Sequence, residues 1–146
     1  MPRAVIRLAR AACVAWAALL PMPVPAAADV LDRLMGRPWS HVRPEGGACE
    51  EAFWFELNPE RSRLTVRLNE PVPSRDIVGD TFHYQLREVH ETTARMFLEH
   101  ETWRDGSGQL VEWWLILLGP DSFAWRRSDW PIWNLTPLRY RCALPG

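Results

Sequence analysis

Short runs in which apolar and polar residues alternate restrict this chain to a fold built from β-strands. The alternation is clear at 53–57 and at 64–68, and the turn-forming segment Asn58-Pro59-Glu60-Arg61-Ser62 connects the two. A period of two places every second side chain on the same face of a strand. The same pattern adds strands at 39–42, 81–89, 94–104, 110–118, 122–127 and 139–142. Seven or eight consecutive strands after one short helix at 29–35 predict an all-β fold, an antiparallel up-and-down barrel or a sandwich.

The first 28 residues have the pattern of a secretory signal peptide. Three arginines precede a ten-residue apolar run at 11–20, and an A-x-A cleavage pattern ends at Ala28. A membrane anchor would need roughly 20 apolar residues, whereas prolines interrupt this run from Pro21 onward. We therefore expect cleavage before Asp29, a single barrel domain over 29–146, and no transmembrane segment after cleavage.

The residues after the signal peptide carry a small negative charge. All 18 acidic residues lie there together with 14 of the 17 arginines, which gives a formal charge of −4. Proteins that bind nucleic acid through phosphate contacts usually carry a large positive excess, so no nucleic-acid partner is expected. Every basic residue is Arg, and the lack of Lys beside abundant Ala and Pro is typical of a GC-rich bacterial coding sequence. Together with the signal peptide, this predicts a periplasmic or secreted bacterial protein.

Two of the three cysteines, Cys49 and Cys142, follow the signal peptide. Cysteines of exported proteins are usually oxidised, so these two are predicted to form a disulfide that joins the start of the domain to its end. Because the bridge would close a long loop, it would restrict the unfolded chain and stabilise a small domain. Two unpaired buried thiols are the alternative.

Turn signals predict the strand register, because a slip of one residue would turn a strand inside out. A hairpin at 105–108, Asp-Gly-Ser-Gly, would place Met96 opposite Leu117. The same hairpin would place His100 opposite Trp113.

Two further turns extend this register into one continuous inner face. The connection at 119–121 places Trp113 opposite Arg127, and the turn at 90–92 places Tyr84 next to Leu98. This face carries polar groups at one end, which a solid core satisfies poorly and a partly open cavity accommodates. The predicted ligand-binding residues are Phe55, Tyr84, His100, Trp113, Trp125 and Arg127. In the alternative interpretation, the tryptophans fill the core of a small barrel.

The outer face of the same strands also carries aromatic residues, Phe97, Trp103 and Trp114. An apolar patch of this kind is covered in most soluble proteins. We expect the helix at 29–35 and the segment at 130–133, Trp-Pro-Ile-Trp, to cover it. A subunit or ligand interface is the alternative.

No motif in the chain indicates a catalytic, metal or cofactor site. His83, His90 and His100 lack a metal-binding spacing, and the predicted register places His83 and His100 on opposite faces. Glu101 and Glu112 oppose each other in that register, but a solvated face is the more common reason for such a pair. We therefore expect a protein that is not an enzyme and holds no metal or cofactor.

The order of elements resembles a lipocalin-like (calycin) barrel. The chain has a short N-terminal helix, then Gly36-Arg37-Pro38-Trp39 at the first strand, a run of hairpins, and a terminal Arg and Cys. Lipocalins have Gly-x-Trp where this chain has Gly-x-x-Trp. The resemblance implies an up-and-down barrel with a cup for small apolar ligands, sealed at one end by Trp39 with Arg139 or Arg141.

Two functions are compatible with these observations. The first is a non-enzymatic exported β-barrel that binds a small hydrophobic or amphipathic ligand. The alternative is a protein-binding module, such as an inhibitor of an envelope enzyme. In size, export and disulfide, the chain also resembles the small periplasmic barrels that inhibit lysozyme. The predicted contact surface for that role is the outer patch of Phe97, Trp103 and Trp114, or the loop at 69–79.

Overall fold

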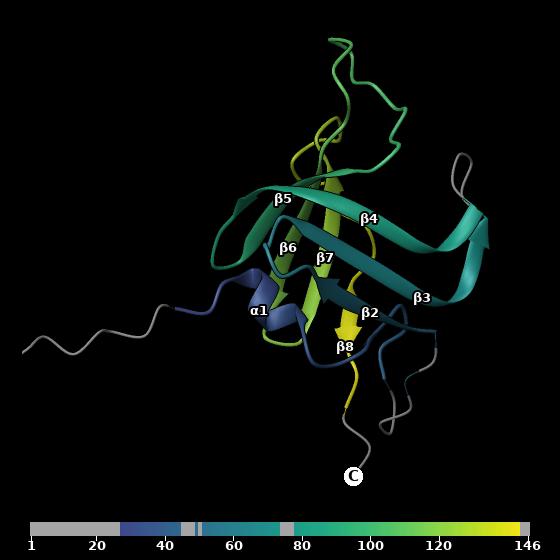
Figure 1. Cartoon of the computed structure of the whole chain (residues 1–146), viewed down its shortest axis with the longest axis vertical. Coiled ribbons are helices and arrows are strands. Elements are labelled where there is room, and N and C mark those ends of the chain that lie inside the picture. Colours follow the sequence, from purple (N-terminus) through teal and green to yellow (C-terminus); the bar gives the residue numbers. More distant parts are fainter. Residues whose placement is uncertain (1–26, 45–48, 50, 74–77, 144–146) are drawn as a thin grey trace, which may run out of the picture.

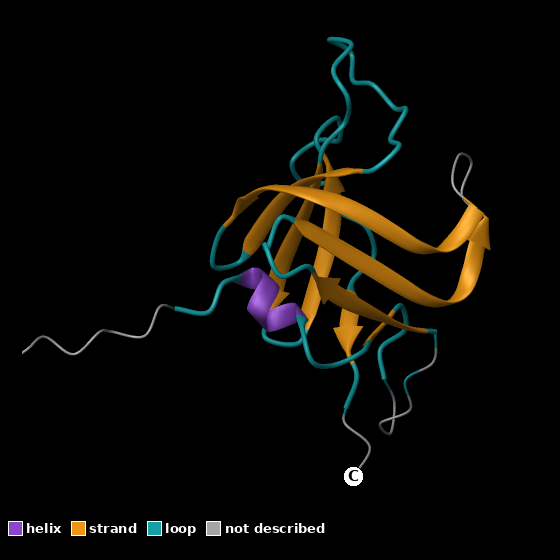
Figure 2. Cartoon of the chain, in the orientation of Figure 1, coloured by secondary structure: helices purple, strands orange, loops and turns teal. Residues whose placement is uncertain are grey.

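The computed structural model describes residues 27–44, 49, 51–73 and 78–143, and the predicted signal peptide lies almost entirely outside them. Eight antiparallel strands form a closed barrel in which each strand pairs with its neighbours in sequence (Figure 1). The elements are α1 (Val30–Leu34), β1 (Trp39–Ser40), β2 (Ala52–Leu57), β3 (Arg63–Pro73), β4 (Val78–Val89), β5 (Thr93–Leu98), β6 (Trp113–Gly119), β7 (Ser122–Arg127) and β8 (Arg139–Arg141). Figure 2 shows how strongly strands dominate the described chain. No helix among the described residues is long and apolar enough to cross a membrane.

Because the strands run up and down in order, their connections alternate between the two ends of the barrel. One end carries α1 and the short β2–β3, β4–β5 and β6–β7 hairpins. The other end, here called the mouth, carries the β5–β6 connection (99–112) and the β7–β8 connection (128–138) (Figure 1). The predicted loop at 69–79 is mostly strand, since β3 continues to Pro73 and β4 starts at Val78; 74–77 lie outside the described residues.

Helix α1 closes the end of the barrel opposite the mouth. Asp29 is its N-cap and forms a capping box with Asp32, which satisfies amide groups that the first turn would otherwise leave unpaired. The helix has one apolar side, and its three fully buried residues are Val30, Leu31 and Leu34. The backbone N–H of Val30 donates to the carbonyl of His90 in the β4–β5 hairpin. These contacts fix the helix against the strands.

Two predicted hairpin registers are confirmed. Across β6 and β7, Trp113 lies opposite Arg127, as the turn at 119–121 predicted. Across β4 and β5, Tyr84 lies opposite Leu98. Each hairpin also contains a register shift, between Leu86 and Glu88 in β4 and between Leu117 and Gly119 in β6. The short turn and this irregularity together set which residues face each other.

The predicted register between β5 and β6 is wrong. Met96 lies opposite Trp113 and not opposite Leu117. The pairing is shifted by four residues along β6. Because four is even, the same side chains still face the barrel interior.

The error arises from where the two strands end. β5 stops at Leu98, and His100 has φ +64°, in the left-handed region that a strand does not use. The turn at 105–108 does form, but only as the tip of the connection, where Arg104 and Leu110 make a single isolated bridge. The connection rises well beyond the strands (Figure 1).

Aromatic rings fill the barrel from the α1 end toward the mouth. Trp39 and Phe123 have ring centroids 4.9 Å apart in an edge-to-face arrangement. Phe55 meets Phe123 at 5.5 Å and Trp125 at 6.4 Å. Such geometries are favourable for aromatic pairs. The aromatic rings are therefore core residues from the α1 end of the barrel up to Trp125, as the alternative interpretation of the sequence predicted.

Arginines, and not the helix or the 130–133 segment, cover the outer aromatic residues. α1 lies at the barrel end, and Ile132 and Trp133 are themselves 75% and 81% exposed. The guanidinium of Arg87 lies 4.9 Å from the ring centroid of Phe97. Arg95 and Arg126 lie 5.8 Å and 5.4 Å from that of Trp114. The predicted cover by α1 and 130–133 is therefore wrong.

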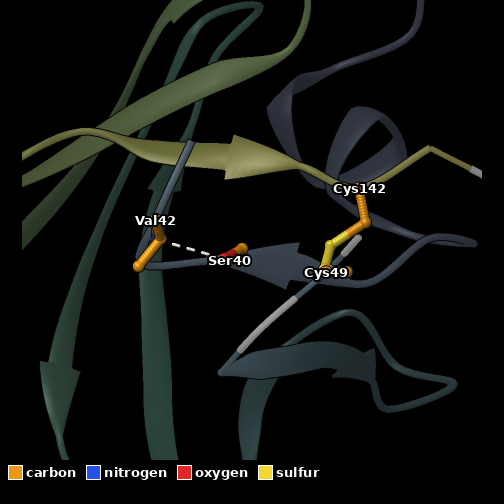
Figure 3. The surroundings of a disulfide bond; sticks show 4 residues. All are labelled: Ser40, Val42, Cys49 and Cys142. Atoms are coloured by element: carbon orange, nitrogen blue, oxygen red, sulfur yellow. Dashed lines mark hydrogen bonds between the residues drawn. A yellow bond between two sulfur atoms is a disulfide. The ribbon is translucent and has the colours of Figure 1, made fainter. Parts of the chain in front are cut away.

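Cys49 and Cys142 form the predicted disulfide, with Cα atoms 5.5 Å apart (Figure 3). Cys142 is 1% exposed, and its backbone N–H donates to the carbonyl of Pro38. The bridge therefore ties the connection between β1 and β2 to the residue that follows β8.

Candidate functional site at the barrel mouth

The two connections at the mouth are joined by hydrogen bonds. The backbone N–H of Ser128 donates to the carbonyl of Glu112, and the N–H of Glu112 donates to the Ser128 hydroxyl. Within the longer connection, the N–H of Val111 donates to the carbonyl of Trp103. The polar end of the inner face thus lies beneath two connected segments.

Tyr84 lies on the inner face of β4 and stacks on Trp125 of β7. The ring centroids are 5.2 Å apart, with an interplanar angle of 19°. Tyr84 is only 9% exposed. Within the described part of the chain, its hydroxyl has no hydrogen-bond partner. Burial, and secondarily the negative charge of Glu101, raise the pKa of Tyr84 far above its ordinary value, so the phenol stays neutral.

Glu101 places a carboxylate at the mouth in a fixed orientation. Its Oε2 accepts a hydrogen bond of 3.1 Å from the indole Nε1 of Trp113. Its Oε1 accepts 3.0 Å hydrogen bonds from the backbone N–H groups of Thr102 and Trp103. Among the described residues, no Arg or His forms an ion pair with it. The carboxylate is hydrogen-bonded but not neutralised.

Arg127 is neutralised and enclosed by the chain itself. Asp129 binds it through two hydrogen bonds of 3.0 Å and 2.7 Å. The guanidinium lies 4.2 Å from the ring centroid of Trp103, and 5.8 Å and 5.7 Å from those of Trp113 and Trp130. Three indoles therefore surround a cation whose charge is already paired.

Four of the six predicted site residues meet at the mouth: Tyr84, Trp113, Trp125 and Arg127. Phe55 lies deeper, in the aromatic core, where it touches Trp125. His100 is exposed in the turn after β5, so the prediction that it faces the interior is wrong.

Sequence reasoning missed four residues at this site: Glu101, Trp103, Asp129 and Trp130. All lie in the two connections, where no strand alternation indicates which way a side chain points. The sequence instead predicted Trp103 in the outer aromatic patch and Trp130 in the segment that covers it.

The acidic residues that sequence analysis paired have separate partners. Glu112 accepts hydrogen bonds from Arg95, and Glu101 accepts one from Trp113. Among the described residues, no group of three side chains is suited to hold a metal ion. Neither observation assigns a reaction.

A cleft of about 570 Å³ lies outside the barrel, beneath the 99–112 connection. Its walls include Arg95, Phe97 and Glu112. Arg95 already binds Glu112 and Glu88. The mouth is the stronger candidate for a binding site, because there aromatic rings adjoin the Glu101 carboxylate, which forms no ion pair with the described residues.

No protein-family model, curated protein or solved structure matches this chain.

Proposed function

We propose that this protein is a non-enzymatic, exported β-barrel that binds a small apolar or amphipathic ligand at its mouth. Tyr84, Trp113 and Trp125 supply the apolar walls, and the polar groups of the two connections orient the ligand's head group. The barrel is filled below Trp125, so the ligand is bound near the mouth and not deep in the interior.

The unpartnered hydroxyl of Tyr84 carries this proposal. The ring of Tyr84 is buried, but its hydroxyl oxygen is not among the fully buried side-chain atoms that lack a partner, so the hydroxyl still reaches solvent. It lies at the border between the aromatic core and the polar mouth. A ligand that enters at the mouth can therefore hydrogen-bond to this hydroxyl in place of water.

A contact at the opposite end supports a lipocalin-like assignment of the fold. Arg141 stacks on Trp39, and its Nη2 donates to the backbone carbonyl of Arg33 in α1. A Trp and an Arg that seal the closed end of the barrel are what the resemblance implied for Trp39. In such barrels the open end takes the ligand, and here that end is the mouth.

Binding to the Tyr84→Phe variant tests the proposal. Twelve-carbon amphiphiles with neutral, cationic and anionic head groups would be titrated below their micelle concentration and followed by tryptophan fluorescence. We expect one site per chain for at least one of them, and binding weakened about fivefold to tenfold by Tyr84→Phe because one hydrogen bond is lost. Tyr140→Phe in β8 is the matched control and should bind like the wild type.

Two results would contradict the proposal. One is the absence of saturable binding for every amphiphile. The other is equal affinity of the wild type and the Tyr84→Phe variant.

The exposed segment at the mouth favours a second candidate, a protein-binding module. Ile132 and Trp133 are largely exposed, although the segment is ordered by a hydrogen bond from the N–H of Asn134 to the carbonyl of Pro131. Exposed tryptophans in rigid loops often anchor protein interfaces. The outer patch of Phe97, Trp103 and Trp114 gives less support, since arginines cover two of its rings and Trp103 contacts Arg127.

Native mass spectrometry of the exported protein separates the two candidates. A retained small-molecule mass supports ligand binding. A protein complex that is lost in a Trp133→Ser variant supports the second function.

A further inference from the structure

We propose that the mouth selects amphipathic ligands with a positively charged ammonium head group, for which Glu101 is the counter-ion. This inference rests on the proposed ligand-binding function and names the ligand class.

The charges at the mouth carry the inference. Asp129 pairs with Arg127 in a two-hydrogen-bond contact, so this guanidinium offers no free positive charge to a carboxylate. Arg104, in the 99–112 connection, is directed to the carbonyl of Gly108 and lines the outer cleft. Asp105, at the tip of the connection, accepts hydrogen bonds from the Ser107 hydroxyl and from the backbone N–H of Gln109. Glu101 lies against Trp113, and among the described residues no Arg or His forms an ion pair with it.

The orientation of Glu101 makes it a suitable counter-ion. Three N–H groups, one from the Trp113 indole and two from the backbone, hold the carboxylate in place. A carboxylate oxygen accepts more than one hydrogen bond, so Oε2 can accept another beside that of Trp113. An ammonium group has three donors and can use this oxygen together with the hydroxyl oxygen of Tyr84.

Tyr84 supports the same head-group class. Its ring is buried, its hydroxyl makes no hydrogen bond to the described residues and still reaches solvent, and the charge of Glu101 acts on it. A ligand that donates hydrogen bonds is suited to both oxygen groups. The hydrocarbon part of the ligand would then lie against Trp125 and Trp113, whose rings meet edge to face at 6.4 Å.

The aromatic surroundings also favour a cation. Indole rings attract positive charge through their faces, and Trp103, Trp113 and Trp130 already hold the guanidinium of Arg127 in this way. An anionic head group would instead meet the negative carboxylate of Glu101 at short range, where like charges repel in a partly buried site.

A matched series of ligands tests the inference. Dodecylammonium, dodecanol and dodecanoate have the same chain and differ in head group, and their affinities would be measured by calorimetry below the micelle concentration. For the wild type we expect dodecylammonium to bind at least tenfold more tightly than dodecanoate. This ratio should shrink as salt is raised, because the preference is electrostatic.

Two variants that each remove one negative charge show whether the preference for an ammonium head group arises from Glu101. Glu101→Gln keeps an oxygen that accepts from Trp113 but removes the negative charge, and it should bring the ammonium and carboxylate affinities within about twofold of each other. Glu91→Gln removes one negative charge at the α1 end, beside Arg33, and should keep the wild-type ratio. If Glu101→Gln fails to fold, the wild-type ratio and its dependence on salt still decide the question.

The outcomes distinguish this inference from the function on which it rests. If dodecanoate binds as tightly as dodecylammonium, or more tightly, the head-group inference is wrong while ligand binding stands. An unchanged ratio of dodecylammonium to dodecanoate affinity in Glu101→Gln also contradicts the head-group inference. If none of the three ligands binds, both proposals fail.

Discussion

The guanidinium of Arg141 lies over the indole of Trp39, 4.9 Å from the ring centroid, and so joins the last strand of the barrel to the first. The same arginine donates to the backbone carbonyl of Arg33 in α1, and Trp39 Nε1 donates to the carbonyl of Leu34. Two residues thereby hold together the helix and both strands that close the barrel.

Arg141→Ala should lower the free energy of unfolding by about 2 kcal/mol, since it removes a cation–π contact and a hydrogen bond to α1. Urea denaturation followed by tryptophan fluorescence measures this change. Asp121→Asn is the control, because the Asp121 carboxylate is exposed and lies 3.5 Å from Arg141 Nε; it should shift stability by less than about 0.5 kcal/mol. Equal stabilities of the two variants would contradict the role of Arg141 as a seal.

Loss of the disulfide should destabilise the protein strongly. Cys49 and Cys142 are separated by 93 positions, and closing so long a loop restricts the unfolded chain. The double variant Cys49→Ser with Cys142→Ser should lose about 4 kcal/mol in a denaturation experiment. Reduction of the wild type should give the same loss. Unchanged midpoints after reduction would show that the bridge does not contribute.

The contact between Arg61 and α1 should make stability depend on acid pH. The hydrogen bond from Arg61 holds the pKa of Asp32 below its ordinary value. The contribution of this pair is therefore complete above pH about 4, where an unfolded Asp is ionised, and is lost as the pH falls through the lowered folded pKa. In Asp32→Asn, stability at neutral pH should be slightly reduced and should fall less between pH about 4 and 2. Circular dichroism during acid titration measures this, and parallel curves for wild type and variant would contradict the linkage.

Tyr84→Phe should leave the stability of the free protein nearly unchanged while it weakens ligand binding. The hydroxyl makes no hydrogen bond to the described residues and still reaches solvent, so we expect a change of less than about 0.5 kcal/mol in the free energy of unfolding. Urea denaturation measures this change. A clear loss of stability in this variant would show that the hydroxyl already has a stabilising partner.

The same residue should affect stability at alkaline pH. The pKa of Tyr84 is raised by burial, so the folded state keeps its phenol proton above pH about 10, where an unfolded Tyr loses it. Stability that is present below this pH should therefore be lost as the pH rises further. Tyr84→Phe should remove this part of the alkaline loss, as denaturation series at pH about 9 and 11 would show.

Local sequence was sufficient for the features that depend on near neighbours. Strand alternation predicted the barrel, and the turn at 119–121 predicted that Trp113 faces Arg127. The tertiary structure also pairs Cys49 with Cys142, as expected from two cysteines in an exported chain. Each of these follows from side-chain period, turn length or a simple count, none of which requires distant contacts.

Only the tertiary structure determined the strand register and the side-chain contacts in segments where the alternation of apolar and polar residues ends. The register of β5 and β6 depends on a 14-residue connection, in which a good local turn forms at 105–108 without aligning the strands. Likewise, Asp129 neutralises Arg127, and Glu101 takes the place at the mouth that was predicted for His100. The physical reason is that ion pairs, stacking and the charge of a site depend on which side chains meet in space, and local periodicity in a loop does not encode those meetings.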